Sequence, residues 1–312
     1  MWAELALAAW ASLARDTFRS GWRSAKVLDG PKGRPAAAWP LAHVLWAAAE
    51  VRVLDGDPSL DILTDALRPL RSGDGYAATR RGTRYFDDNA WLGLAFLRLA
   101  AATADPAWQQ AARGLAGFVA LGEDPAGGVR WAEGSTSRNT CSTASSAWLV
   151  LDTGTRDAPA MASRWMDWLD RTLRRPDGLY GDRVDGGVVH DEAWTYNQGA
   201  ALAATRSLGR PTATLRSAIL AHWAAQGLWR EPPAFVAIAY RALLAGPGAD
   251  EVIDRWDPYL HRLVDEAREP TGWFRGGGVG RYDERPTLDQ AAVVQLFALR
   301  SGVTSGVRRS PA

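Results

Sequence analysis

Apolar residues recur with helical spacing along nearly the whole chain, and the helices they predict are of two kinds. One kind is apolar on all sides for two or three turns, which predicts a helix buried from every direction. These segments are residues 40–49, 90–97, 145–151, 199–204, 234–239 and 290–299. The other kind has one apolar and one charged face, as expected of a surface helix. These segments are residues 4–23, 59–71, 107–121, 160–174, 212–226 and 250–268.

The two kinds alternate strictly along the chain, and this alternation predicts the fold. Consecutive helices joined by short loops pack antiparallel, so a buried helix followed by a surface helix predicts a helical hairpin. A set of such hairpins closes into an inner ring of helices inside an outer ring. An open solenoid is the alternative, but it needs polar end helices, and capping character is weak at both ends of this chain. We therefore predict an all-α (α/α)6 toroid made by a single domain of residues 1–312, with residues 302–312 as a flexible tail.

The long loops each lead from a surface helix into the next buried helix, so the ring would gather them at one end, here called the mouth. These loops are residues 73–86, 123–139, 175–195, 227–233 and 269–287. Within the third loop, Asp185-Gly186-Gly187 lies between two short runs that we expect to form a β-hairpin. Loops gathered at one end of a rigid scaffold are the usual place for a functional site.

The composition of the chain limits the kinds of binding partner that we expect. The 312 residues carry a formal net charge of +1, which gives no electrostatic attraction toward nucleic acid or an anionic membrane. The chain also lacks an apolar run of about 18 residues, the length that predicts a membrane span. The 16 Trp residues are the unusual feature. Core packing accounts for some of them, and the flat indole face with its N–H donor also suits a sugar ring.

The cysteine and histidine content of the chain bears on disulfides and cofactors, and its N-terminal residues bear on the cellular compartment. Cys141 is the single cysteine, so no internal disulfide is expected. The 4 His include no pair at i, i+4, so we expect neither a metal site nor another cofactor. Glu4 stands where a secretory signal carries bases, so we expect a cytoplasmic protein if residue 1 is the true start. The sequence contains no signal for an oligomeric state.

Two adjacent carboxylates, Asp87 and Asp88, stand at the start of a buried helix and at the predicted mouth. Acids are favourable at a helix N-terminus, so one interpretation is a capping residue followed by a first-turn acid. The other interpretation is a catalytic pair. Neighbouring side chains can hold two carboxyls roughly 5 Å apart, which is the spacing of a retaining glycosidase. Carboxyls that close do not both ionise readily, so one keeps its proton near neutral pH and serves as the acid.

The segment Tyr85-Phe86-Asp87-Asp88-Asn89-Ala90-Trp91 resembles the catalytic segment of glycoside hydrolase family 76, the α-1,6-mannanases, and further matches follow in the family's order. They are Gly127-Gly128-Val129 with Trp131, Arg138-Asn139-Thr140 in place of Lys-Asn-Thr, Trp194-Thr195-Tyr196-Asn197-Gln198-Gly199, and fainter matches at residues 235–238 and Gln290. One departure is Thr143, where family members commonly carry Asn.

The resemblance implies a fold and a reaction. The family fold is the (α/α)6 toroid, which agrees with the fold predicted from the helix pattern. The implied activity is cleavage of α-mannosidic linkages, expected to be α-1,6, with retention and without a metal. In the family the first acid of the pair is the nucleophile and the second the general acid/base, which here are Asp87 and Asp88.

The expected partner is a mannose-containing oligo- or polysaccharide, and the matched motifs and mouth loops supply candidates for binding it. Each candidate also has a structural interpretation as a helix start, an ordinary loop residue or a core side chain. The candidates are Tyr85, Asn89, Trp131, Arg138, Asn139, Trp194, Tyr196, Asn197 and Trp273.

Three alternatives to hydrolysis stay open at this point. A transglycosylase would pass the same covalent intermediate to a sugar hydroxyl instead of water. A sugar epimerase or isomerase of the same toroid shape would need a His pair at the mouth, where only His190 is expected. A carbohydrate-binding protein without catalysis would keep the fold, but the intact acid pair argues against it.

Overall fold

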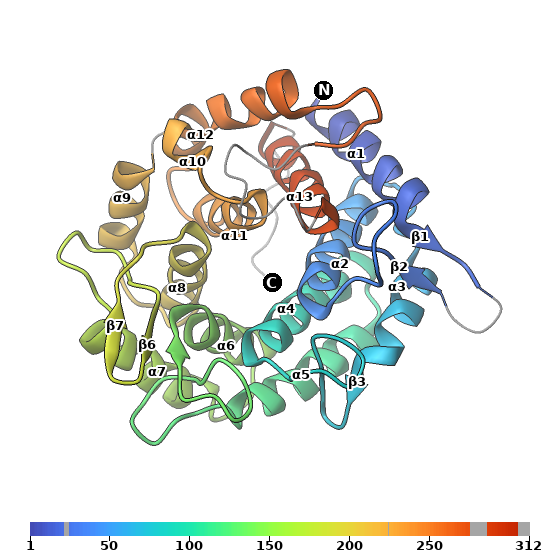
Figure 1. Cartoon of the computed structure of the whole chain (residues 1–312). Helices are drawn as coiled ribbons and strands as arrows, with labels where there is room; N and C mark the ends of the chain where they lie inside the picture. The colour runs from blue at the N-terminus through green and yellow to red at the C-terminus, as the bar shows by residue number, and fades with distance from the viewer. Residues whose placement is uncertain (22–24, 224, 275–285, 305–312) are drawn as a thin grey trace.

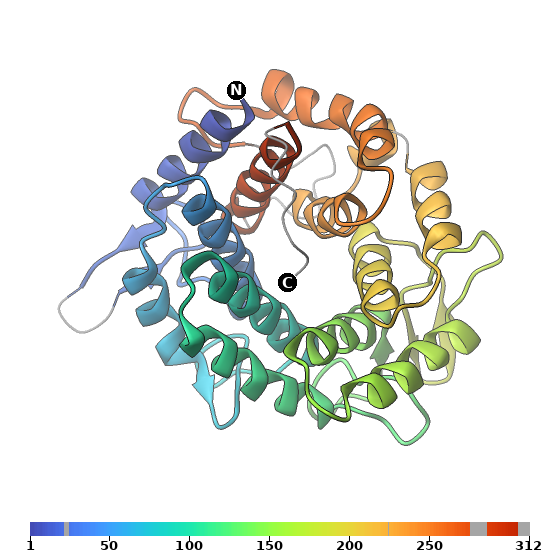
Figure 2. The same ribbon diagram turned by 180° about the vertical axis from the view of Figure 1, so that it is seen from behind.

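The computed structural model describes residues 1–21, 25–223, 225–274 and 286–304, and these form a closed double ring of helices (Figures 1 and 2). Each inner helix contacts the next around the ring, and the last one contacts the first. The inner helices are α2 (Ala38–Val53), α4 (Phe86–Thr103), α6 (Thr140–Thr153), α8 (Thr195–Ser207), α11 (Pro233–Leu244) and α13 (Pro286–Thr304). This closure confirms the predicted toroid over the open solenoid.

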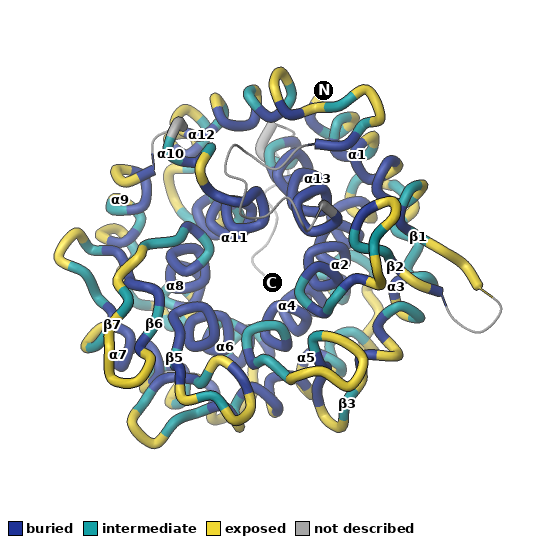
Figure 3. Tube along the Cα trace, viewed as in Figure 1, coloured by how far each residue is buried: buried dark blue, intermediate teal, exposed yellow. Residues whose placement is uncertain are grey.

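The outer ring is formed by the amphipathic helices. They are α1 (Trp2–Thr17), α3 (Leu60–Leu67), α5 (Pro106–Ala120), α7 (Ala158–Thr172), α9 (Ala213–His222) with the short α10 (Ala225–Leu228), and α12 (Ala249–Arg262). Helix α1 packs on α13, so the first and last helices of the chain make the final pair of the ring. Figure 3 shows the resulting burial, with the inner helices dark blue along nearly their whole length. Within the described residues, no helix has the length and apolar character to cross a bilayer.

Several predicted boundaries were wrong, each for a local reason. The first helix ends at Thr17 and not at residue 23, because the chain turns at Phe18 into a two-stranded sheet. The second outer helix changes to 3-10 geometry over Arg68–Leu70, where Pro69 has no N–H to donate. The outer helix predicted at 212–226 is divided at Trp223, and the one at 250–268 ends in a π-helix, Leu263–Ala267.

The predicted tail is also corrected at its start. Residues 302–304 continue helix α13, which ends at Thr304, while residues 305–312 lie outside the described residues.

Among the described residues, short strands form only in the loops before the inner helices. The predicted hairpin is confirmed, with strands β6 (Arg183–Asp185) and β7 (Val188–His190) joined by Gly186-Gly187. Both glycines have positive φ, 55° and 81°, as a two-residue hairpin turn requires. The other strands are β1 (Phe18–Arg19), β2 (Lys26–Val27), β3 (Arg71–Ser72), β4 (Gly75–Tyr76) and β5 (Arg138–Asn139), which pairs with β6.

Side chains at the start of four inner helices bind the backbone of the loop that precedes them. In three of these helices a carboxamide oxygen accepts from a loop N–H, and its NH₂ group donates back to a loop carbonyl. The three N–H···O distances are 2.7 Å for Tyr76 to Asn89, 2.8 Å for Tyr180 to Gln198 and 3.0 Å for Phe274 to Gln290. We call these contacts the loop clasps.

The fourth clasp explains the Thr143 departure. Its hydroxyl accepts from the Val129 N–H at 2.9 Å, so a shorter polar side chain performs the same task in α6. Because buried backbone groups without partners are unfavourable, each clasp fixes the position of its loop over the end of the ring.

An ionic network lies at the end of the ring opposite the mouth. Glu50 of α2 is fully buried and pairs with Arg98 of α4 and with Arg241 of α11, both at 2.8 Å. Arg241 also donates to Gln295 of α13 at 3.3 Å and lies over the ring of Trp46 at 4.9 Å. The network therefore connects four of the inner helices across the centre of the ring.

One inner pair packs closely enough to require glycine. A Cβ added to Gly199 of α8 would lie 2.6 Å from the Cα of Ala239 in α11, and backbone cannot yield as a flexible side chain can. The same substitution at Gly114, inside the outer helix α5, meets nothing within 4 Å.

We expect opposite effects from these two substitutions. Gly199→Ala should lower the free energy of unfolding by about 1–3 kcal/mol because the two helices must separate. Gly114→Ala should raise it by about 0.5–1 kcal/mol because alanine is favoured in a helix interior. Urea titrations of both variants measure this. An unchanged Gly199→Ala midpoint would contradict the close packing of α8 and α11.

Candidate active site

The acid pair lies in the first turn of α4, at the mouth. The residues before it pair with the loop that leads to α6, where the Phe86 N–H donates to the Trp131 carbonyl at 2.9 Å and the Glu133 N–H to the Arg84 carbonyl at 3.1 Å. This pairing places Trp131 beside the start of α4. Its indole is 41% exposed and its ring centroid is 4.8 Å from that of Tyr85, so an aromatic surface faces the solvent next to the pair.

The two oxygens of Asp87 have different surroundings. Oδ2 accepts hydrogen bonds from the Trp131 Nε1–H at 3.3 Å and from the Cys141 Sγ–H at 3.4 Å. Oδ1 is buried and has no hydrogen-bond partner among the described residues. The N–H groups of Asp87 and Asp88, at the N-terminus of the helix, also stabilise the carboxylate.

Burial raises the pKa of Asp87 to about 6, and the four donors only partly offset this effect. A carboxyl with this pKa is ionised in about nine molecules of ten at pH 7. It is also more basic than an exposed aspartate, which favours attack on an electrophilic carbon. Asp88 is the next residue of the helix and is half-buried. Successive side chains point about 100° apart around the helix axis, so the two carboxyls face different parts of one space.

Aromatic side chains from other inner helices surround this space. Tyr196 of α8 stacks on Phe235 of α11 with ring centroids 4.0 Å apart, and Trp194 meets the same ring at 5.9 Å. Trp39 of α2 lies 5.8 Å from Phe235 on another side. These contacts make an aromatic cluster centred on α11, which lies across the ring from α4 (Figure 1).

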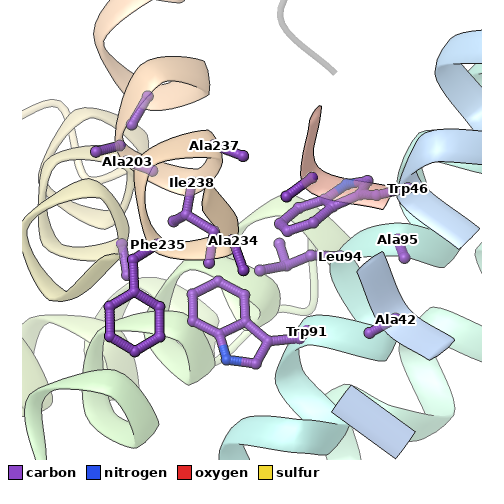
Figure 4. Packing of buried hydrophobic residues seen from close by; sticks show 14 of the residues in the cluster. Ala42, Trp46, Trp91, Leu94, Ala95, Ala203, Ala234, Phe235, Ala237 and Ile238 are labelled. Atoms are coloured by element: carbon purple, nitrogen blue, oxygen red, sulfur yellow. The ribbon is translucent and has the colours of Figure 1, made fainter. Parts of the chain in front are cut away.

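The floor is made by Trp91 and Trp46. Trp91 is one helical turn below Asp87 on the same helix, and its ring centroid is 6.0 Å from that of Trp46. Figure 4 shows both indoles pointing into the centre of the ring, opposite Ala234 and Ile238 of α11. Apolar residues therefore close the space beneath the acid pair.

A third carboxylate, Asp182, lies close to this group. Its Oδ1 accepts from the Asn197 Nδ2–H at 3.1 Å and its Oδ2 from Arg183 at 2.7 Å. The negative charges of Asp182 and Asp87 both help to raise the pKa of the Cys141 thiol and of the Tyr196 hydroxyl, although burial is the largest cause for each. Asn197 keeps its buried Oδ1 without a partner among the described residues. Within the residues that the structure describes, no group of three or more His, Cys, Asp or Glu side chains is placed to hold a metal ion.

Contacts at the mouth thus join most of the predicted site residues to Asp87 directly or through neighbours, and Asp88 adjoins Asp87 in the sequence. The residues are Asp87, Asp88, Tyr85, Trp131, Trp194, Tyr196 and Asn197. Their candidate roles in sugar binding remain predictions.

Two candidates within the matched motifs have structural contacts, and for Asn89 these contacts correct the predicted role. Asn89 is fully buried and forms a loop clasp, with all its hydrogen bonds to the backbone of Tyr76 and Tyr85. Asn139 is 7% exposed and caps α6 in a capping box with Ser142. The Asn89 amide is therefore not available to a sugar, whereas a binding role for the Asn139 amide stays a prediction.

Arg138 and Trp273 have contacts with the outer ring of helices. The Arg138 guanidinium lies over the ring of Trp168 in the outer helix α7 and donates to the Gly127 carbonyl. Trp273 is 7% exposed, and its indole N–H donates to Asp16 of the outer helix α1 at 2.8 Å. The stacking role predicted for Trp273 is therefore replaced by a contact that joins the last loop to the first helix.

Sequence reasoning missed Cys141, Asp182, Phe235 and Trp39 as parts of this site. Cys141 directly follows the matched Arg138-Asn139-Thr140 and Phe235 begins the matched residues 235–238, and these positions were the available signal. Asp182 precedes the predicted hairpin, and Trp39 directly precedes a predicted buried helix. Only the ring brings these residues to Asp87.

A pair of adjacent acids at the mouth of an (α/α)6 ring, with aromatic side chains around it, defines a glycoside hydrolase. The family model described as glycosyl hydrolase family 76 matches residues 13–216, and the chain belongs to that family. No curated protein sequence matches significantly.

Solved structures have the same fold at low sequence identity. A family 76 mannosidase from Bacteroides thetaiotaomicron is 18% identical with a TM-score of 0.81, and the match covers 99% of this chain and 100% of that one. An inactive variant of an α-1,6-mannanase from Salegentibacter sp. is 21% identical with a TM-score of 0.79, covering 96% and 99%. The Lin0763 protein from Listeria innocua is 18% identical with a TM-score of 0.76, covering 99% of each chain.

The environment of Asp87 makes a prediction that needs no substrate. In protein labelled with ¹³C at aspartate carboxyls, one resonance should titrate near pH 6, and Asp87→Asn should remove it. Trp131→Phe deletes a donor that stabilises the charged form, so this midpoint should move to higher pH. A wild-type spectrum in which Asp87 titrates near 4 would contradict the effect of burial.

Proposed function

We propose that this family 76 enzyme hydrolyses α-1,6-mannosidic linkages in a mannose-containing oligo- or polysaccharide, with retention of configuration. The observation that carries the proposal is the state of Asp87. Its carboxylate is ionised near neutral pH, has one oxygen fixed by donors and the other without a partner, and lies beside Asp88. This combination suits a nucleophile next to an acid.

In the first half of the reaction, Oδ1 of Asp87 attacks the anomeric carbon. A carbon–oxygen bond forms as the glycosidic bond breaks, and the leaving oxygen takes the proton of Asp88. Adjacent carboxyls favour this starting state, because the negative charge of one raises the pKa of the other. The hydrogen bonds to Oδ2 keep the carboxylate oriented throughout.

In the second half, water replaces the aspartate. Asp87 is now an ester without charge, so Asp88 loses its negative neighbour and is ready to accept a proton. It takes that proton from water as the water oxygen bonds to the anomeric carbon, and Asp87 leaves as a carboxylate. Two displacements at the same carbon give a product with the configuration of the substrate.

The relatives support the linkage and the partner. The Salegentibacter structures are described as an α-1,6-mannanase, inactive when two consecutive aspartates are replaced by Asn or by Ala, in complex with α-1,6-mannotriose and α-1,6-mannotetrose respectively. We carry the same linkage over to this chain, where the consecutive acids in the mouth are Asp87 and Asp88.

Replacing either acid should abolish turnover and keep the fold. Asp87→Asn and Asp88→Asn should each lower kcat on α-1,6-mannotetraose by roughly a thousandfold or more, with an unchanged circular dichroism spectrum. Asp57→Asn, in a short loop on the opposite end of the ring, is a matched control. Near-normal turnover of either variant at the mouth would show that its aspartate is a helix cap.

A separate test shows which acid is the nucleophile and which is the general acid/base. With a mannoside whose leaving group needs no proton, such as 2,4-dinitrophenyl α-mannoside, Asp88→Asn should regain the first half of the reaction, whereas Asp87→Asn should not. Proton NMR of the first product should show the α-anomer. A first product in the β-configuration would exclude retention, and transfer to an added acceptor sugar would favour the transglycosylase.

The closed floor makes a prediction about substrate length. Binding energy raises turnover only where added sugar units touch protein, and Trp46 and Trp91 close the space beneath the pair. The value of kcat/KM for α-1,6-linked oligosaccharides should therefore stop rising within a few mannose units. Kinetics on a ladder of purified oligosaccharides measures this, and continued growth with length would show a longer binding surface.

A further inference from the structure

The two oxygens of Asp87 have different contacts, and Cys141 is one of the two side chains that cause this difference. Both side-chain donors, Trp131 and Cys141, end on Oδ2, while Oδ1 is buried without a partner among the described residues. A carboxylate can rotate about its bond to Cβ, and a single donor would leave that rotation weakly restrained. Two donors from different elements hold the carboxylate plane.

Cys141 is itself held in a donating arrangement. It is the second residue of α6 and is 2% exposed, and the Tyr196 hydroxyl lies close enough to its sulfur to lower the pKa of the thiol while its own pKa is raised. The Tyr196 ring is fixed in turn by stacking on Phe235 at 4.0 Å. Burial raises the pKa of the Cys141 thiol well above its usual value, so the group keeps its proton and acts as a donor toward Asp87.

We propose that Cys141 is a positioning residue of the reaction: its thiol, fixed by Tyr196, holds Oδ2 of Asp87 so that Oδ1 faces the anomeric carbon. The inference rests on the proposed function for the identity of the reaction. The ordinary role for a buried cysteine is core packing. The hydrogen bond to the nucleophile goes beyond packing, because a small apolar side chain could not donate it.

The charged and titratable groups around Asp87 set the direction of the expected effect. Asp88 adjoins it on α4, Cys141 lies on α6, Tyr196 on α8, and Asp182 stands before β6. Burial disfavours a negative charge on Asp87, while the thiol favours it. Loss of the thiol donor must therefore raise the pKa of Asp87.

Three substitutions separate donation from packing. Cys141→Val keeps an apolar side chain of similar volume without a donor, Cys141→Ala removes both, and Cys141→Ser keeps a donor. With α-1,6-mannotetraose as substrate, the acid limb of the pH profile of kcat/KM should move to higher pH by about half a pH unit in the Val and Ala variants. The value of kcat/KM at pH 7 should fall roughly tenfold. Cys141→Ser should restore the wild-type limb.

Ser145→Ala is the matched control. Ser145 is buried one turn further along α6, and its hydroxyl donates to the Cys141 carbonyl at 2.6 Å. Its loss perturbs the same helix without removing a donor from Asp87, so the acid limb should stay in place. A shift of equal size in Ser145→Ala would assign the effect to the helix and overturn the proposal.

The ¹³C titration of Asp87 tests the role of Cys141 without depending on the identity of the reaction. If wild-type protein cleaves the substrate and Cys141→Val has the wild-type limb, the inference fails and the proposed function stands. If wild-type protein does not cleave it, the proposed function fails, and the carboxyl midpoint still decides whether the thiol holds Asp87. An equal midpoint in wild type, Cys141→Val and Cys141→Ser would overturn the inference. A variant that does not fold is replaced by Cys141→Ala in the same comparison.

Discussion

The loop clasps are the constraint on which the site depends. The inner helices are apolar on all sides, so a polar side chain in their first turn must find a partner or destabilise the ring. Asn89, Gln198, Gln290 and Thr143 find that partner in the backbone of the preceding loop. Each loop is therefore tied to the helix that it leads into. The catalytic turn of α4 adjoins one such tie, which is why its acids have a defined position although they stand at the edge of a loop.

The same helix start places Asp87 between two opposing effects. Burial against apolar neighbours disfavours its charge, while helix N–H groups and two side-chain donors favour it. The balance leaves a carboxylate that is ionised at neutral pH and still poorly solvated, which is the condition for a reactive nucleophile. An exposed aspartate would be ionised but weakly basic. A fully buried one without donors would remain protonated.

The ring could be predicted from the sequence because burial on every side leaves a plain signal in residues such as those of α2 and α11. The acid pair could be located because adjacent acids before an apolar helix are uncommon in combination with long loops. Individual binding residues were harder. Asn89 and Asn197 look alike in sequence, yet the first binds loop backbone and the second faces Asp182. Cys141 is 54 positions from Asp87, and a contact across that separation has no local pattern. Helix ends such as Thr17 depend on tertiary contacts for the same reason.

The ionic network around Glu50 has a consequence for how a sugar chain can reach and leave the site. Glu50, Arg98 and Arg241 connect opposite sides of the inner ring, with Trp46 above them, so side chains occupy the centre. Passage of a sugar chain through the ring at this end would require these ion pairs to open. The architecture therefore favours entry of the glycan and exit of the product at the mouth, where the acid pair lies.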